Sequence, residues 1–275
     1  MLLVLLGAAL HAAWNGIVKT GPDRYLDIAS LLAAAALLTL LWLPFLPLPA
    51  RACWPYLAAS ALIHQVYFTF VALAYRKGEM SVVYPLMRGM APALTALASA
   101  LVLREHPSVG GYIGVCLVSG GVVLLTFERR GGAKIALAPA LLALANAGVI
   151  AFYTLVDGVG VRLSGHAFSY TSWGFLLSAS LFAPTALLLR RREAVAHFKG
   201  QWRNSFIGAG CSLASYGLAL WAMTKAPIAT VAALRETAIL FGLVLAVFSL
   251  KEKVRGGRVV AVALVAAGAV IIKLS

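Results

Sequence analysis

The chain has 275 residues, of which 62% are hydrophobic and only 12% are charged, whereas soluble domains carry about 25% charged residues. One soluble core cannot bury that much apolar surface, so the composition excludes an ordinary soluble domain and indicates a membrane protein. The formal net charge of +14 does not indicate nucleic-acid binding, because the Lys and Arg residues lie in short gaps between apolar runs.

Ten apolar runs follow one another along the chain. A membrane-spanning helix needs about 20 mainly apolar residues, and breaks at charges, Pro and Gly divide the sequence at that length. The first run lacks a basic n-region and holds polar residues, so we expect an uncleaved helix rather than a signal peptide. The expected spans are 2–20, 28–48, 54–75, 79–103, 107–127, 135–157, 168–189, 203–224, 227–250 and 256–273.

The basic residues are distributed unevenly between alternate connections. Sixteen Lys and Arg residues fall on one side of the expected spans and five on the other. Basic residues prefer the cytoplasmic side of a membrane, so we expect both termini outside. Only Arg88 and Arg235 belong to neither side, because they lie within the fourth and ninth spans.

These two arginines also reveal an internal repeat. An offset of 147 residues pairs Arg88 with Arg235 and Glu105 with Glu252, across two spans and their connection. Each half then has five spans, an odd number, so the second half must be upside down relative to the first. The predicted fold is an all-α membrane protein with ten transmembrane helices arranged as two inverted five-helix repeats. The predicted repeats are residues 1–130 and 131–275.

The sequence resembles the EamA half-module of the drug/metabolite transporter superfamily, and the resemblance covers the whole chain. It is carried by Tyr84-Pro85, Pro92, Leu103-Arg104-Glu105, Gly114, Gly120-Gly121, their counterparts Leu250-Lys251-Glu252 and Gly268, and Trp14-Asn15-Gly16 with Lys19. The resemblance implies ten helices around a central cavity and alternating access. In the amino-acid exporter branch, it implies amino acids and related metabolites as substrates. The four-helix multidrug members of the superfamily carry a membrane-embedded glutamate in their first helix, where this chain has His11 and Asn15.

Arg88 and Arg235 are the first candidates for a substrate site. At about 1.5 Å per residue both lie near the middle of the membrane, so each must face the protein interior or a wet cavity. A guanidinium there suits a substrate carboxylate. The alternative is a structural arginine that is bonded to backbone carbonyls or to Glu236. Glu236 in turn could carry a proton, bind a substrate ammonium, or pair with Arg88 from a facing helix.

The first helix and the fourth supply the remaining candidates. His11 and Asn15 are four residues apart, so they lie on the same face of the helix, and this face is suited to a pore wall. Trp14 lies between them in the sequence. Tyr84 precedes Arg88 by one turn and could form an aromatic wall beside the guanidinium. Hydrogen bonding between helices, or helix packing, is the alternative role for each of them. The full predicted substrate site is His11, Trp14, Asn15, Tyr84, Arg88, Arg235 and Glu236.

The predicted function is a secondary transporter of the inner membrane that exports amino acids, including aromatic and apolar ones, and related small metabolites. A multidrug or hydrophobic-cation exporter is the alternative within transport, and an intramembrane enzyme is the alternative of another class. We expect no catalytic residues, because H-E-x-x-H and paired aspartates are absent from the sequence. We also expect no metal, no cofactor and no nucleic-acid partner. The expected partners are a small-molecule substrate and lipid, and a monomer and a homodimer both remain open.

Overall fold

The structure is a computed structural model that describes residues 1–77, 80–128, 136–241 and 256–275. All secondary structure in these described residues is helical. The long elements are α1 (Leu2–Thr20), α2 (Arg24–Trp42), α3 (Trp54–Lys77), α4 (Met80–Ala98), α5 (Val109–Glu128), α6 (Leu137–Ser164), α7 (Ala167–Met223), α8 (Ile228–Arg235) and α10 (Gly256–Leu274). Short helical turns are η1 (Leu43–Phe45), η2 (Arg51–Cys53) and η3 (Ser99–Leu103).

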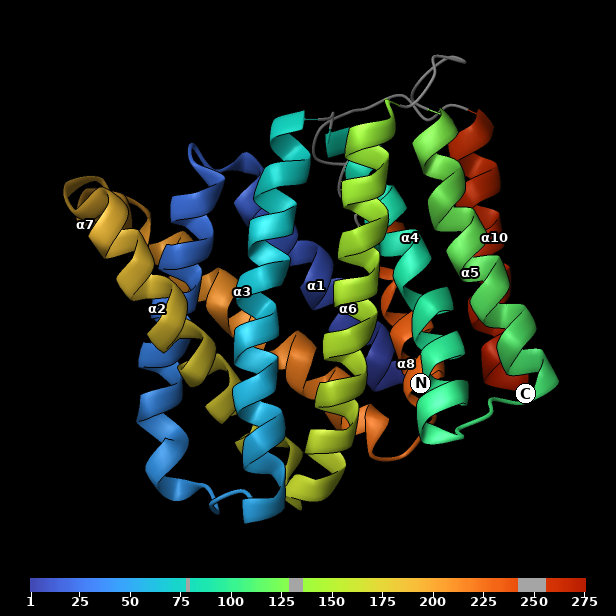
Figure 1. Ribbon diagram of the computed structural model, residues 1–275, viewed down its shortest axis with the longest axis horizontal. Coiled ribbons are helices and arrows are strands. Elements are labelled where there is room, and N and C mark those ends of the chain that lie inside the picture. The colour runs from blue at the N-terminus through green and yellow to red at the C-terminus, as the bar shows by residue number, and fades with distance from the viewer. Residues whose placement is uncertain (78–79, 129–135, 242–255) are drawn as a thin grey trace.

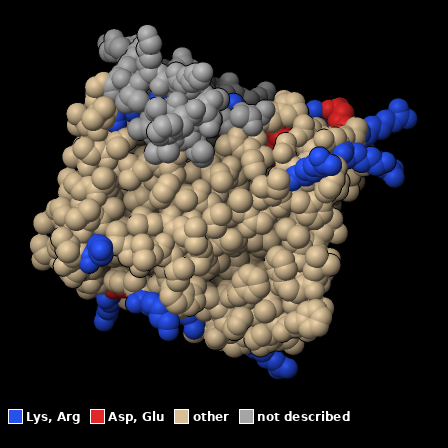
Figure 2. Space-filling model, turned by 180° about the vertical axis from the view of Figure 1, so that it is seen from behind, with Lys and Arg blue, Asp and Glu red and all other residues tan. Residues whose placement is uncertain are grey.

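The helices have the length and the surface of a membrane protein. Six described helical segments are long and apolar enough to cross a membrane, judged by length and composition. Large apolar side chains face outward, among them Leu188 at 85% exposure and Leu2 at 83%. Figure 2 shows a face that is mostly free of charged side chains, with Lys and Arg gathered mainly near its upper right and lower edges. Such a surface is stable against lipid rather than water.

The helices pack as one bundle. In Figure 1, α2 and α7 form one flank, α5 and α10 form the opposite flank, and α1, α3 and α6 lie between them. The N and C marks both lie in the lower right part of this view.

The element α7 contains two arms rather than one rod. Its 57 residues would extend about 85 Å as a straight helix, well beyond the roughly 30 Å hydrocarbon core. The backbone leaves helical geometry at Arg190, where φ is −143° and ψ is 47°. Figure 1 shows the chain turning back at this end of α7. The arms correspond to the expected spans 168–189 and 203–224, but the basic segment between them is helical and not an irregular connection.

The expected ninth span, 227–250, is interrupted in its described part. α8 ends after eight residues at Arg235, and Glu236 and Thr237 form a turn. Their N–H groups donate to Ala233 and Leu234, three residues back, at 3.0 and 3.2 Å. This tighter pattern is typical of a local 3₁₀ turn within a helix. Residues 242–250 of this span lie outside the described residues.

A glycine seam joins α5 to α10. A Cβ added to Gly114 would lie 2.8 Å from the carbonyl oxygen of Gly268, and one added to Gly121 would lie 2.8 Å from that of Ala261. Only glycine allows backbones to approach so closely. Contacts move forward along α5 as they move backward along α10, so the two helices are antiparallel. These glycines are therefore used for packing between two helices of the same chain.

Candidate functional site

A cavity of about 240 Å³ lies between α1, α2, α3, α4, α6, α7 and α8. Its lining residue Arg24 is exposed at the surface, where α1 ends and α2 begins. At the opposite side, where α6 ends and α7 begins, the lining residues Tyr170 and Leu220 are each only 1% exposed. We call these the open end and the closed end of the cavity. The cavity therefore reaches the surface at one end and stops inside the protein at the other.

The three candidate residues of α1 all line the cavity. The indole Nε1–H of Trp14 donates to Nδ1 of His11 at 3.3 Å, and the two rings meet edge to face with centroids 5.1 Å apart. The side-chain amide of Asn15 donates to the carbonyl oxygen of His11 at 2.8 Å. These local bonds fix the orientation of the polar face that α1 presents to the cavity.

Arg88 and Glu236 form a buried, doubly bonded ion pair between α4 and the turn after α8. Nη2 of Arg88 lies 2.6 Å from one carboxylate oxygen of Glu236, and Nε donates to the other at 3.1 Å. Both side chains are 7% exposed. Proline at position 92 cannot donate to the carbonyl of Arg88, so α4 is locally weakened beside the pair. The sequence left two roles open for Arg88, a substrate clamp and a structural bond to Glu236. In the structure, Arg88 is bonded to Glu236.

Arg235 has a different environment, although it is equivalent to Arg88 in the repeat. It is 8% exposed, it lines the cavity, and its guanidinium carbon lies 5.1 Å from the ring centroid of Tyr216. The contact is a cation–π interaction. Within the described part of the chain, no carboxylate forms an ion pair with this guanidinium. The Tyr216 hydroxyl donates to Asp157, and the hydroxyl of Tyr170 donates to the other oxygen of Asp157 at 2.9 Å.

Aromatic side chains form much of the remaining wall. Tyr153 stacks at a tilt on His64 with centroids 4.4 Å apart, and Phe68 packs on Phe182 at 4.9 Å. Tyr84 lines the cavity, as Arg88 does. The aromatic lining is Trp14, Tyr25, Tyr67, Phe68, Tyr84, Tyr153, Tyr170, Phe175, Phe182 and Tyr216. Rings with polar edges favour a ligand that carries both an apolar part and hydrogen-bonding groups.

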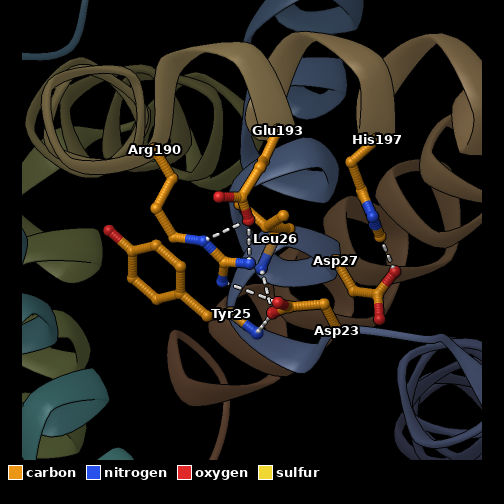
Figure 3. A network of polar contacts seen from close by, with 7 residues as sticks. All are labelled: Asp23, Tyr25, Leu26, Asp27, Arg190, Glu193 and His197. Atoms are coloured by element: carbon orange, nitrogen blue, oxygen red, sulfur yellow. Dashed lines mark hydrogen bonds and ion pairs between the residues drawn. The ribbon is translucent and has the colours of Figure 1, made fainter.

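A polar network joins α2 to α7 beside the open end (Figure 3). Asp23 accepts hydrogen bonds from the N–H groups of Tyr25 and Leu26 at the start of α2, and it pairs with Arg190 at 2.6 Å. Arg190 also pairs with Glu193. One turn further along α7, Nε2 of His197 lies 2.8 Å from a carboxylate oxygen of Asp27. The network holds the kink of α7 against the first turn of α2.

A second polar cluster lies at the closed end, around Glu105. One oxygen of Glu105 is 2.8 Å from Nη2 of Arg162, and the other accepts from Ile228 N–H at 2.9 Å and Ser99 Oγ at 3.1 Å. Arg162 also donates to the carbonyl oxygens of Met223 and Ala226, at 2.7 and 3.0 Å. Glu105 thus joins the α4–α5 connection to the end of α6 and to the start of α8.

Six of the seven predicted site residues line the cavity, and Glu236 lies behind it against Arg88. The site prediction did not include Asp157, Tyr153 and Tyr216. A second offset could have found the first two, because 142 residues separate His11 from Tyr153 and also Asn15-Gly16 from Asp157-Gly158. Among the described residues, no group of three or more His, Cys, Asp or Glu side chains could hold a metal ion.

The fold and the cavity together define a polytopic helical membrane protein with a solute-sized site near its centre. The chain belongs to the EamA-like transporter family, because the model of that family matches residues 1–127 and again residues 137–274. The resemblance seen in the sequence is thereby confirmed. The protein is a multi-pass membrane transporter for a small molecule, built from two EamA repeats.

One solved structure, described only as "Crystal structure of protein", is similar to this chain with a TM-score of 0.73. The alignment covers 99% of this chain and 94% of that chain at 18% sequence identity, so it shows the shared fold alone. A comparison with curated proteins gave no match.

Proposed function

We propose that this protein exports amino acids, including aromatic and apolar ones, and related small metabolites across the cell inner membrane by alternating access. The observation that carries the proposal is Arg235. Its guanidinium faces the cavity over the ring of Tyr216, whereas Glu236 neutralises the equivalent Arg88. A buried cation needs an anionic partner, and a substrate carboxylate supplies one.

The size and the walls of the cavity support a small amphipathic solute. Its volume of about 240 Å³ is below the roughly 300–1,000 Å³ that is usual for drug-sized ligands. The aromatic lining offers apolar surface for a side chain, and Arg235 offers charge at one place. An inorganic ion would leave the aromatic surface unused.

The glycine seam supports ten spans in two inverted halves, residues 1–130 and 131–275. The offset of 147 moves Gly114 to Ala261 and moves Gly121 to Gly268. The contact of Gly114 with Gly268 thus becomes the contact of Ala261 with Gly121, which is also present. Two contacts that exchange under the offset are what a two-fold axis would produce, and an axis that relates antiparallel helices runs across them, in the membrane plane.

The positive-inside bias supports a cytoplasmic open end. Arg24 at the mouth belongs to the side with sixteen basic residues. The structure then corresponds to an inward-facing state, in which a cytoplasmic solute can enter for export. A reporter fused to the C-terminus is expected to be active only outside the cytoplasm, and cytoplasmic activity would contradict this orientation.

Uptake of radiolabelled amino acids into proteoliposomes tests the proposal. Arg235→Gln is expected to keep the folded yield and to lose transport at least about 10-fold, since a charged hydrogen bond is lost. Arg88→Gln is expected to lose yield and transport together, because it strands Glu236. Glu193→Gln, on the exposed kink of α7, is the matched control and should leave both unchanged. Unchanged transport in Arg235→Gln would exclude the carboxylate clamp.

The second candidate function is export of hydrophobic cations. Asp157 favours it, because a carboxylate and an aromatic wall together suit a quaternary ammonium. Arg235 argues against cation export, because its guanidinium lines the same cavity and would repel a cationic substrate. Uptake of tetraphenylphosphonium in the same liposomes decides between the two, since the amino-acid exporter should not transport it.

A further inference from the structure

Asp157 is a buried carboxylate to which neither the fold nor the family match assigns a role. Only 2% of the residue is exposed, and it projects from α6 into the cavity wall. Its two described partners are the hydroxyls of Tyr170 and Tyr216, which are neutral donors. A carboxylate can accept about four hydrogen bonds, so the two from the tyrosines leave about two acceptor positions of Asp157 for a ligand. A buried anion is costly unless a cation compensates it, and no described side chain forms an ion pair with Asp157.

One tyrosine links this anion to Arg235, the buried cation that forms no ion pair among the described residues. The ring of Tyr216 lies 5.1 Å from the guanidinium carbon of Arg235, and its hydroxyl donates to Asp157. One tyrosine side chain therefore contacts both opposite charges, and both charged residues line the same cavity. An α-amino acid carries its ammonium and its carboxylate on a single carbon. With a charged hydrogen bond of about 2.8 Å at each end, such a ligand can bridge two protein groups that are not themselves in contact.

The repeat shows that this carboxylate breaks the symmetry of the cavity. Asn15 follows His11 by four residues on α1, and Asp157 follows Tyr153 by four residues on α6. The amide of Asn15 is already bonded to the His11 carbonyl, and it carries no charge. At this pair of equivalent positions, one half thus offers an amide and the other an anion. The difference gives the cavity a negative pole, which fixes the orientation of a dipolar ligand.

We propose that Asp157 binds the ammonium group of a zwitterionic α-amino acid whose carboxylate is bound by Arg235, an inference that rests on the proposed amino-acid transport. Tyr216 occupies the gap between the two charges and gives up its hydrogen bond when the ligand enters. The side chain of the ligand lies against the aromatic wall. Specificity for an α-amino acid, over a simple carboxylate or a simple amine, follows from the two poles together.

Three probes with the same side chain test the assignment in proteoliposomes: phenylalanine, 3-phenylpropionate, which lacks the ammonium, and phenethylamine, which lacks the carboxylate. The wild-type chain is expected to transport phenylalanine at least about 10-fold faster than either analogue. Asp157→Asn should lose this preference over 3-phenylpropionate, and Arg235→Gln should lose the preference over phenethylamine. Glu193→Gln is the carboxylate-to-amide control, and it should keep both ratios.

Ratios of rates separate binding from folding, because a structural defect lowers the transport of all three probes together. Should Asp157→Asn fail to fold, binding of the probes to the wild-type chain, followed by tryptophan fluorescence, still applies. Equal affinity for phenylalanine and 3-phenylpropionate would overturn the assignment. It would also be overturned if Asp157→Asn kept its preference for phenylalanine while losing only its response to a pH gradient, which is the behaviour of a proton carrier. If the folded wild type transported no α-amino acid, the proposed function itself would fail.

Discussion

The two ends of the cavity both carry polar contacts between the halves of the chain, but the contacts are placed differently. At the closed end, Glu105 of the first half binds Arg162 and the N-terminus of α8 in the second half. At the open end, Asp23 and Asp27 bind α7 beside a mouth where Arg24 is exposed. The contacts of Glu105 join connecting segments of both halves across the closed end of the cavity. The contacts of Asp23 and Asp27 join only α2 to α7, on one flank of the bundle. This difference indicates that the closed-end cluster maintains the present state, whereas the open-end network maintains the fold of α2 and α7.

The largest effect is expected midway between the two ends, at the most buried pair. Arg88→Gln leaves the Glu236 carboxylate without its cation, and we expect a loss of about 3–5 kcal/mol in the free energy of unfolding. The double variant Arg88→Met with Glu236→Leu should recover most of this loss, because neither charge is then buried. Unfolding in mixed micelles measures both values. A single variant as stable as the parent would show that the pair is not structural.

An intermediate effect is expected at the closed end. Glu105→Gln removes the ion pair with Arg162, which is partly exposed, and we expect a shift of about 1–2 kcal/mol towards opening. Cys53 reports on this end, because it is fully buried and packs in the same core cluster as Tyr170. With Cys116 and Cys211 replaced by Ser, maleimide labelling of Cys53 should accelerate about 5–30-fold.

The matched open-end variant for that experiment is Asp27→Asn. It breaks a polar contact of similar type, with His197, but on the other side of the cavity. Labelling of Cys53 should stay at the parent rate in this variant. Equal acceleration in the two variants would remove the distinction between the ends.

The smallest effect is expected for Asp23, whose pair with Arg190 is about one-third exposed. Burial acts to raise the pKa of Asp23, but hydrogen bonds from Arg190 and from the Leu26 and Tyr25 N–H groups outweigh it and lower the pKa below its ordinary value. Its stabilising contribution is therefore present above the ordinary carboxyl pKa and is lost as the pH falls below it. Asp23→Asn should cost about 1 kcal/mol or less at neutral pH, with the difference from the parent vanishing in acid. Thermal unfolding at a series of pH values measures this.

Length and hydropathy were sufficient to predict an all-helical membrane fold, and the 147-residue offset predicted its two related halves. They did not predict the helical link inside α7, because a basic run is read as a connection, while its backbone remains free to continue as a helix. Between Pro184 and Gly200 the sequence contains no helix breaker, so propensity favours continuation. The interruption after Arg235 was also unpredicted, since no Gly or Pro marks it.

The candidate site was predictable where depth in the membrane was the signal. Arg88, Arg235 and the α1 residues were found because a polar side chain within the membrane is costly in free energy and therefore indicates a functional or structural role. The sequence named Arg88 as one partner for Glu236 but left a substrate role open beside it, since 148 residues of chain separate Arg88 from Glu236 and set no distance. Asp157 is not part of the predicted site, and it falls at the end of an expected span, 135–157. The helix in fact runs on to Ser164, which places Asp157 within it.

The antiparallel glycine seam between α5 and α10 also bears on how such a chain can assemble. The packing surfaces of α5 and α10 are equivalent and complementary, so we expect the two helices to pack together even when the halves are not covalently joined. If the halves are inverted as proposed, we expect two half-length chains, expressed separately and inserted in opposite orientations, to associate through this seam. In the single chain, the covalent link between the halves fixes one partner of the seam in each orientation.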